Sequence, residues 1–169
     1  IEALHSRTFF AAFPENPSPA VYGESADSNA KEKFQAMWGK RFEELNQPDP
    51  VSWIGQEESP YTQDTLQISY PSFSIQQLTE RSTTAYHQWR KVGVKERAGI
   101  LMESLEGVKG RFFEIAYATM HTTGQGYMMA FQASGPHAAD RALEAIAAGY
   151  EELQRFPASA LWDKPMGKF

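Results

Sequence analysis

Apolar side chains recur at the spacing of an α-helix through most of the second half of the sequence, between about residues 74 and 156. Helices with this pattern place one apolar face against a core. Ser74 and Gln77 have the pattern of a capping box at the start of the first helix, and Ser134 and Pro136 suit the start of the last, since proline loses no internal hydrogen bond there. Four helices are expected, which end before Gly93, near Gly107 and Gly110, at Gly124 and near Pro157. The positions expected to be buried are Ile75, Leu78, Ser82, Ala85 and Trp89 in the first helix, Ala98, Leu101, Met102 and Leu105 in the second, Phe112, Ile115, Ala116 and Thr119 in the third, and Ala139, Leu143, Ile146, Ala147, Tyr150 and Leu153 in the last.

The first seventy residues have a different pattern. Three prolines between residues 12 and 22 disfavour helix and sheet and predict an extended arm that lies over another surface. Residues 25–39 predict one short helix. Alternation at Leu66, Ile68 and Tyr70 predicts a half-buried strand, which residues 51–54 would pair with as a hairpin. The expected fold is mainly α with a small β-hairpin, divided into an arm with one helix and the hairpin (residues 1–70), a helical layer (71–157) and the beginning of a further segment (158–169).

Composition excludes several classes of function. The chain has 21 acidic against 16 basic residues, a net charge of −5, and its Lys and Arg side chains form no stripe. Because nucleic acids are bound by clustered positive charge, nucleic acid is not an expected partner. Cysteine is absent, which excludes disulfides, thiolate metal sites and a cysteine nucleophile from these residues. No secretory signal and no apolar run of about eighteen residues is present, so we expect a soluble cytoplasmic protein without membrane contact. The first residue is not Met, and we expect the chain to be cut at one or both ends.

The candidate chemical groups do not form a recognisable catalytic motif. No two histidines lie three or four residues apart, so no metal site is expected. The two glycines after His121 lack the spacing of a phosphate-binding loop and predict a capped helix end with a tight turn. His137 and Asp140 predict a surface hydrogen bond. No serine has the flanking glycines of a hydrolase nucleophile. The group Met120, Met128, Met129 and Phe131 is interpreted as adaptable core, although it could face a ligand channel if a second domain covered it.

Several segments resemble known enzymes. Residues 75–89, 94–98 and 112–116, together with the Thr123-Gly124 turn, resemble the amino-terminal helical part of the aldehyde dehydrogenase superfamily, with Gln125 where that family usually has lysine. A narrower resemblance depends on six segments together: residues 13–19, 21–24, 59–61, 120–125, 128–133 and 135–138. These segments resemble the PaaN-type aldehyde dehydrogenases of phenylacetic acid degradation, and this resemblance covers nearly the whole chain.

This resemblance implies that the full-length protein is an NAD(P)-dependent aldehyde dehydrogenase, with NAD or NADP as cofactor and a semialdehyde linked to coenzyme A, derived from an aromatic ring, as substrate. In such enzymes a cysteine attacks the aldehyde, hydride passes to the nicotinamide, and a glutamate activates water. None of that equipment is found here, so we expect the chain to be an inactive fragment that binds no cofactor, with the rest of its own polypeptide as partner and a homo-oligomer as the whole enzyme. The resemblance places Phe131, Ser134 and His137 near the substrate entrance as channel-lining residues, although the residues themselves favour packing or capping roles.

A different class of function is left open by the sequence. A self-contained helical binding or adaptor module would present the group from Met120 to Phe131 as an apolar groove to a peptide or lipid. A fragment should expose the side of its helices that the missing domain covers, and so bind dye or self-associate, whereas an adaptor should be a well-behaved monomer.

Overall fold

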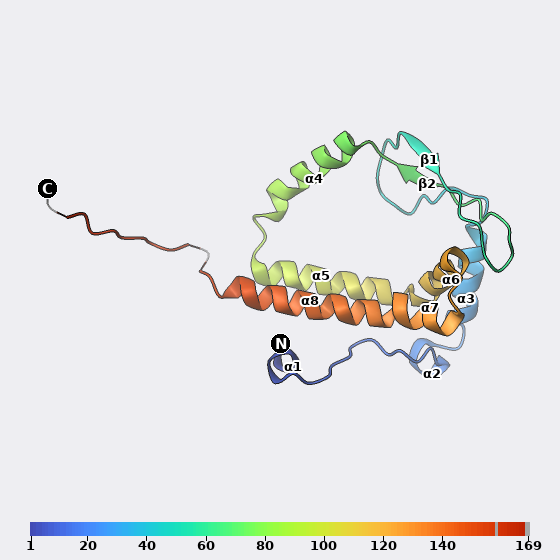
Figure 1. Cartoon of the computed structure of the whole chain (residues 1–169), viewed down its shortest axis with the longest axis horizontal. Helices are drawn as coiled ribbons and strands as arrows, with labels where there is room; N and C mark the ends of the chain where they lie inside the picture. Colours follow the sequence, from blue (N-terminus) through green and yellow to red (C-terminus); the bar gives the residue numbers. More distant parts are fainter. Residues whose placement is uncertain (158, 168–169) are drawn as a thin grey trace.

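The computed structural model describes residues 1–157 and 159–167 of the chain, and the helices and strands of these residues are shown in Figure 1. Three short helices lie in the first part: α1 (Glu2–Ser6), α2 (Pro19–Tyr22) and α3 (Ala26–Ala36). The strands β1 (Ser52–Ile54) and β2 (Tyr70–Ser72) follow. The helical part comprises α4 (Ile75–Trp89), α5 (Val94–Lys109), α6 (Phe112–Thr123), α7 (Tyr127–Ser134) and α8 (Pro136–Gln154). The predicted fold class, mainly helical with one small hairpin, is confirmed.

Helices α5 and α8 lie side by side along the length of the molecule, and α6 and α7 pack with α3 at one end (Figure 1). The amino-terminal arm, residues 1–22, runs along the lower side of α8 in this view. Helix α4 and the hairpin arch over the other side of the pair α5 and α8. After α8 the chain leads away from the body of the molecule, and the structure describes no helix or strand over residues 159–167. The predicted final segment, 158–169, also includes residues 158, 168 and 169, which lie outside the described residues.

The starts and ends of the long helices follow local sequence signals. The predicted capping box at α4 is present, because the Ser74 side chain accepts from the Gln77 backbone N–H while the Gln77 side chain accepts from the Ser74 N–H. Gly124 ends α6 in the left-handed conformation, with φ of 77°, as glycine does without steric cost. The prediction for Ser134 as a helix start was wrong: Ser134 is the last residue of α7, and Gly135 precedes Pro136 at the first position of α8.

The hairpin forms in a register that differs from the predicted strand. Ser52 pairs with Ser72 and Ile54 with Tyr70, so β2 begins where the predicted strand was expected to end. Leu66 and Ile68 alternate inward as predicted and are 2% and 1% exposed. Gln67 between them has φ of 54°, which is the left-handed region and is incompatible with a continuous strand.

The core consists of two neighbouring clusters. The larger one is built on α6, α7 and α8 and includes Phe112, Phe113 and Phe131, and Phe13 from the arm is inserted into it. The smaller one joins Phe34 of α3 to Leu66 and Ile68. The arm therefore lies over another surface as predicted, although its prolines do not exclude helix, since Pro19 takes the first position of α2.

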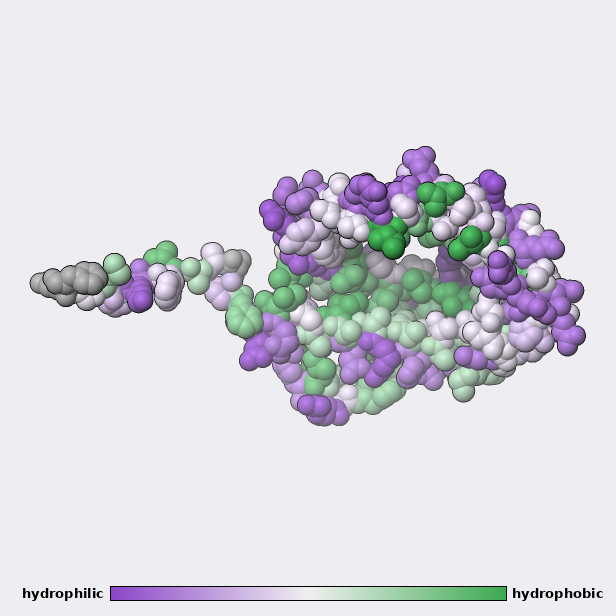
Figure 2. All heavy atoms as spheres, turned by 45° about the horizontal axis from the view of Figure 1, so that its top comes forward, coloured by the Kyte–Doolittle hydropathy of each residue, from purple (hydrophilic) through white to green (hydrophobic). Residues whose placement is uncertain are grey.

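Many side chains of the predicted apolar helix faces are exposed in the described part of the chain. Helix α4 buries none of its residues, and Ile75 is 84% exposed. Only Ala98 of α5 and only Ala139 among the predicted stripe of α8 are buried. Figure 2 shows hydrophobic side chains gathered in the recess that α4 and the hairpin leave above α5 and α8. The predicted burial of Ile75, Leu78, Ser82, Ala85 and Trp89 in α4 was therefore wrong, because the described residues supply no surface that covers this face of the helix.

Among the helices of residues 1–157, none is long and apolar enough to cross a membrane.

Candidate functional site

Phe131 lies in the centre of the larger core cluster. Its side chain is 0% exposed, and its ring centroid lies 4.8 Å from that of Phe113, 5.7 Å from that of Tyr22 and 6.4 Å from that of Phe112. The three rings surround it with tilted or edge-on contacts, which add to the burial of apolar area. Phe131 is therefore a packing residue in the described chain, and a role in a substrate channel stays a prediction.

Ser134 and His137 lie on either side of the junction of α7 and α8, and no hydrogen bond joins them. Thr119 Oγ1 donates to Ser134 Oγ over 3.0 Å, and Ser134 Oγ in turn donates to the carbonyl of Ala130, one turn earlier. Gly135 follows, and its position explains the tight junction, because a Cβ there would lie 2.7 Å from the Phe131 carbonyl oxygen. The channel-lining role of Ser134, like that of Phe131, stays a prediction.

His137 is exposed and lies beside the arm. Its Nδ1 is 3.7 Å from Glu15 Oε1, so its polar partner comes from the arm. The predicted surface hydrogen bond between His137 and Asp140 was wrong, since Asp140 is 6% exposed and accepts from the backbone N–H of Ala12 at 2.8 Å. The proline-rich arm contacts the first turns of α8 through Ala12, and the spacing of residues within the helix did not indicate this contact. For His137 too, a place in a substrate channel stays a prediction.

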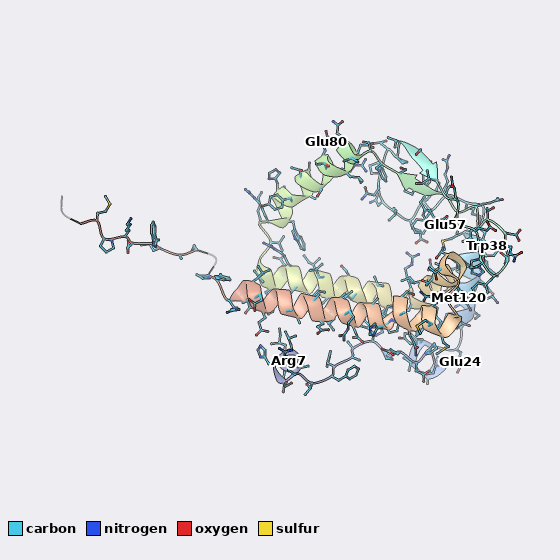
Figure 3. The ribbon with its side chains drawn as sticks, in the orientation of Figure 1. Arg7, Glu24, Trp38, Glu57, Glu80 and Met120 are labelled. Carbon is cyan, nitrogen blue, oxygen red and sulfur yellow. The ribbon has the colours of Figure 1, made fainter. Side chains whose placement is uncertain are left out.

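Two distant segments form a clasp around the end of α6. Ser59 Oγ lies 2.7 Å from Nδ1 of His121, and the Tyr61 hydroxyl donates to the carbonyl of Gln125 at 2.7 Å. The His121 ring stacks on Phe34 at 5.4 Å between centroids and meets Trp38 edge-on at 5.4 Å. Trp38 and Met120 lie at the end of the molecule where α3 meets α6 and α7 (Figure 3). The predicted capped helix end with a tight turn is confirmed, and the clasp adds a tertiary contact to it.

The contacts of the clasp have a structural role. Ser59 is 0% exposed, so its hydroxyl has no path to a substrate although it lies beside an imidazole. Its oxygen also lies 3.3 Å from the backbone N–H of Tyr61, which donates to it. Burial lowers the pKa of His121, because an imidazolium ion loses its hydration there. A neutral His121 that holds Ser59 in place is the arrangement that these contacts favour.

A second polar contact joins α3 to α6 and α7. The hydroxyl groups of Tyr117 and Tyr127 both donate to Asp27 Oδ1, Tyr117 over 2.9 Å. Burial, and then the hydrogen bond to Asp27, raise the pKa of Tyr117 to about 12, and burial likewise raises the pKa of Tyr127. Both phenols therefore stay protonated at neutral pH and act as donors, so that Asp27 fixes the position of α3.

Sequence reasoning missed both contacts because their partners are 62 and more residues apart. One signal was available: residues 59–61 and 120–125 were two of the motifs on which the family resemblance depends, and the structure places them in contact. The group of Met120, Met128, Met129 and Phe131 does not form one surface, since Phe131 is fully buried while Met128 and Met129 are 49% and 59% exposed.

The described residues do not fit a nicotinamide dinucleotide. Such cofactors are held at a glycine-rich turn between a parallel strand and a helix, whereas the sheet formed here is an antiparallel pair of three-residue strands. Within residues 1–157 and 159–167, no three His, Asp or Glu side chains gather to hold a metal ion. No cysteine occurs anywhere in the sequence. No step of hydride transfer or thiolate attack can therefore be assigned to these residues.

A cavity of about 900 Å³ lies elsewhere, between the arm and the pair α5 and α8. Phe131, Ser134 and His137 are not among its lining residues.

Comparison with known proteins identifies a similar solved structure. The crystal structure of the NAD-dependent aldehyde dehydrogenase from Burkholderia multivorans matches with a TM-score of 0.88 and 45% sequence identity. The match covers 99% of this chain and 30% of the longer one, so the chain spans about 30% of the length of the solved structure it matches. No protein-family model matches the chain, and no curated protein matches it.

An identity of 45% over 99% of the chain, together with a TM-score of 0.88, extends well beyond a shared fold class. In both fold and sequence, this chain is similar to one part of an NAD-dependent aldehyde dehydrogenase.

Proposed function

We propose that this chain is the amino-terminal portion of an NAD(P)-dependent aldehyde dehydrogenase, to which it contributes scaffold and part of the wall of the substrate channel. The observation that carries this proposal is the 45% identity, over 99% of the chain, to part of an NAD-dependent enzyme of that class. The aromatic core and the clasp at His121 and Ser59 support a scaffold role, because they fix helices without exposing a reactive group. The chain alone is proposed to be inactive and to bind no cofactor.

The proposed substrate is a coenzyme A-linked semialdehyde from the degradation of phenylacetate or a related aromatic compound. Support comes from the six motifs that resemble the PaaN-type enzymes. Two of these motifs, residues 59–61 and 120–125, contact each other through Ser59, His121 and Tyr61. A contact between two motifs in the fold constrains the residues of both, as expected for an architecture that is shared within a family.

The proposed partner of the chain is the remainder of its own polypeptide, in a cytoplasmic enzyme that forms a homo-oligomer. The apolar face of α4 supports this proposal, since Ile75, Leu78 and Tyr86 are 84%, 49% and 56% exposed. An apolar helix face gains stability only when another surface covers it.

The test is an assay of the full-length polypeptide that contains these residues. Aldehyde-dependent reduction of NAD⁺ and of NADP⁺ would be followed by the absorbance of the reduced nicotinamide, with simple aldehydes and coenzyme A-linked semialdehydes compared. A matched control is the same polypeptide without residues 1–169, which is expected to be inactive and to recover activity when this chain is supplied separately. Absence of aldehyde-dependent reduction in the full-length protein, or a monomeric chain that binds a specific peptide, would favour the adaptor alternative.

A further inference from the structure

The cavity of about 900 Å³ beside the arm has the size of a small-molecule site. Its floor comes from α5 and α8 and its roof from the first ten residues of the chain. Apolar side chains form most of the wall, among them Leu4 and Phe10 from the arm, Met102 from α5, and Ile146 and Ala147 from α8. Met102 and Phe10 are 45% and 59% exposed, so their surfaces are available to an occupant.

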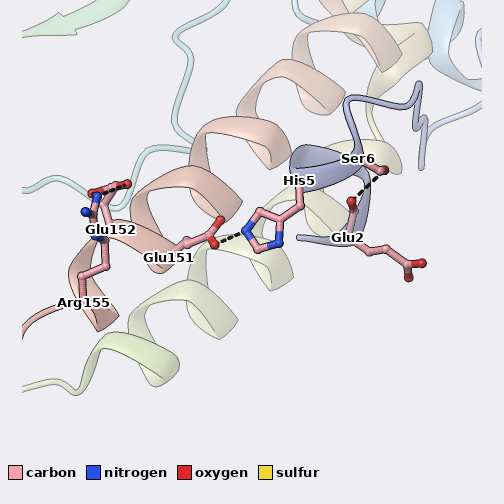
Figure 4. A network of polar contacts seen from close by, with 6 residues as sticks. All are labelled: Glu2, His5, Ser6, Glu151, Glu152 and Arg155. Carbon is pink, nitrogen blue, oxygen red and sulfur yellow. Dashed lines mark hydrogen bonds and ion pairs between the residues drawn. The ribbon is translucent and has the colours of Figure 1, made fainter.

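The arm is attached to α8 at two points, one within the roof and one just beyond it. His5 Nε2 contacts Glu151 Oε1 near the end of α8, as Figure 4 shows. Toward the start of α8, Asp140 Oδ1 accepts from the backbone N–H of Ala12 at 2.8 Å, and Asp140 is only 6% exposed. Beyond this second contact, Phe13 is inserted into the core. The arm is thus held across the cavity at both ends.

The charges around the cavity are unbalanced. Arg141 and Glu144 pair with each other at 2.6 Å between Nη1 and Oε2, and Asp140 is held by the arm. Arg7 and Lys95 also line the cavity and form no ion pair with the described residues. Figure 3 places Arg7 on the arm below α8. The charged side chains of the lining are thus Arg7, Lys95 and Arg141 against Asp140 and Glu144, which leaves an excess of positive charge at the two cations without an ion pair.

We propose that this cavity binds an amphipathic anion, namely a carboxylate attached to an apolar acyl or aryl body. The carboxylate pairs with Arg7 or Lys95, since charge-assisted hydrogen bonds to a cation are among the strong ones. The apolar body lies along Met102, Ile146 and Ala147, where it removes their exposed surface from water. This proposal goes beyond the proposed function, and none of its residues belongs to the predicted channel set.

The experiment is calorimetric titration of the full-length protein with three probes that share a decyl chain: decanoate, decanol and decyltrimethylammonium. We expect decanoate to bind once per chain and at least about 10-fold more tightly than either other probe, which corresponds to a difference of about 1.4 kcal/mol. Equal binding of the three probes, or no binding of decanoate to the full-length protein, would overturn the proposal.

Two kinds of variant locate the site. The double variant Arg7→Gln/Lys95→Gln should weaken decanoate at least about 10-fold and leave decanol unchanged, and each single variant shows which cation contacts the carboxylate. The matched control is Arg155→Gln, which removes a cation that pairs with Glu152 and does not line the cavity. Ala147→Phe fills part of the cavity and should weaken both probes. Because this last variant could disturb folding, the surface charge variants decide the matter: an unchanged affinity for decanoate in the double variant refutes the proposed site.

Discussion

Replacement of Phe131 by alanine tests the placement of this residue in the core. The side chain is 0% exposed and is surrounded by the rings of Tyr22, Phe112 and Phe113. Truncation of a buried phenylalanine to alanine costs about 3–5 kcal/mol through lost burial and the cavity left behind. Aromatic pairs add about 0.5–1.5 kcal/mol each, so we expect the upper half of that range. Since domains are stable by about 5–15 kcal/mol in total, this one change should remove a large share of the stability.

The assay is urea denaturation followed by circular dichroism, and the result expected is a lower midpoint with an unchanged slope. The matched control is Met129→Ala on the same helix, where the side chain is 59% exposed and where a surface change should stay within about 0.5 kcal/mol. A loss below about 1 kcal/mol for Phe131→Ala, or an equal loss for Met129→Ala, would refute the reasoning. A changed KM of the full-length enzyme without a loss of stability would instead support Phe131 as a channel residue.

Three further predictions concern single positions. Gly55→Ala places a Cβ 1.8 Å from the backbone oxygen of Ile68 and should lower the free energy of unfolding by more than about 4 kcal/mol in urea denaturation. Its control, Gly149→Ala in α8, meets open space and should be neutral or stabilising by up to about 1 kcal/mol. Similar effects at the two glycines would contradict this prediction. Burial lowers the pKa of folded His121 below its ordinary 6.5, so the folded chain binds this proton less tightly than the unfolded chain. Stability should therefore fall as the pH falls through 6.5 toward the folded pKa. His121→Gln should remove that part of the pH dependence of the urea midpoint, and an unchanged dependence would exclude His121 as its source. Ser74→Ala should increase hydrogen exchange in the first turn of α4, with a loss of about 0.5–2 kcal/mol, while Ser74→Asp retains the cap; equal exchange in both variants would count against the capping box.

The sequence predicted those parts of the fold that are set by neighbouring residues. The capping box at Ser74 and Gln77 and the left-handed Gly124 involve atoms within a few residues of each other. Local hydrogen bonds and backbone preferences are sufficient to fix such ends. For this reason α4 and α6 were expected close to where they are found.

Predictions failed where a tertiary contact or a local backbone twist intervened. Leu66 and Ile68 have the alternation of a strand and are buried, but the left-handed Gln67 between them interrupts the ladder. At the start of α8, the close packing of Gly135 against Phe112 and the Phe131 carbonyl placed the boundary one residue after Ser134. Neither effect leaves a mark in the hydrophobic pattern.

The candidate site was the least predictable part. Ser59 and His121 are 62 residues apart, and only the folded chain brings the hydroxyl to the imidazole. Asp140 was assigned to His137 by helical spacing, yet its carboxylate accepts from Ala12 at a sequence distance of 128 residues. Pairing over such distances depends on the path of the whole chain, which periodicity within a helix does not encode.

The arch formed by α4 has a consequence for how the molecule responds to its surroundings. This helix of 15 residues buries no side chain, and an isolated helix of that length is only marginally stable in water. Its helicity therefore depends on its own cap and propensities and on the hydrogen bonds that Gln77 and Arg81 donate to residues 47–49, so a small change in what contacts it should shift the balance between coil and helix. A spectroscopic label on α4 would for that reason act as a sensitive gauge of whether another surface has docked.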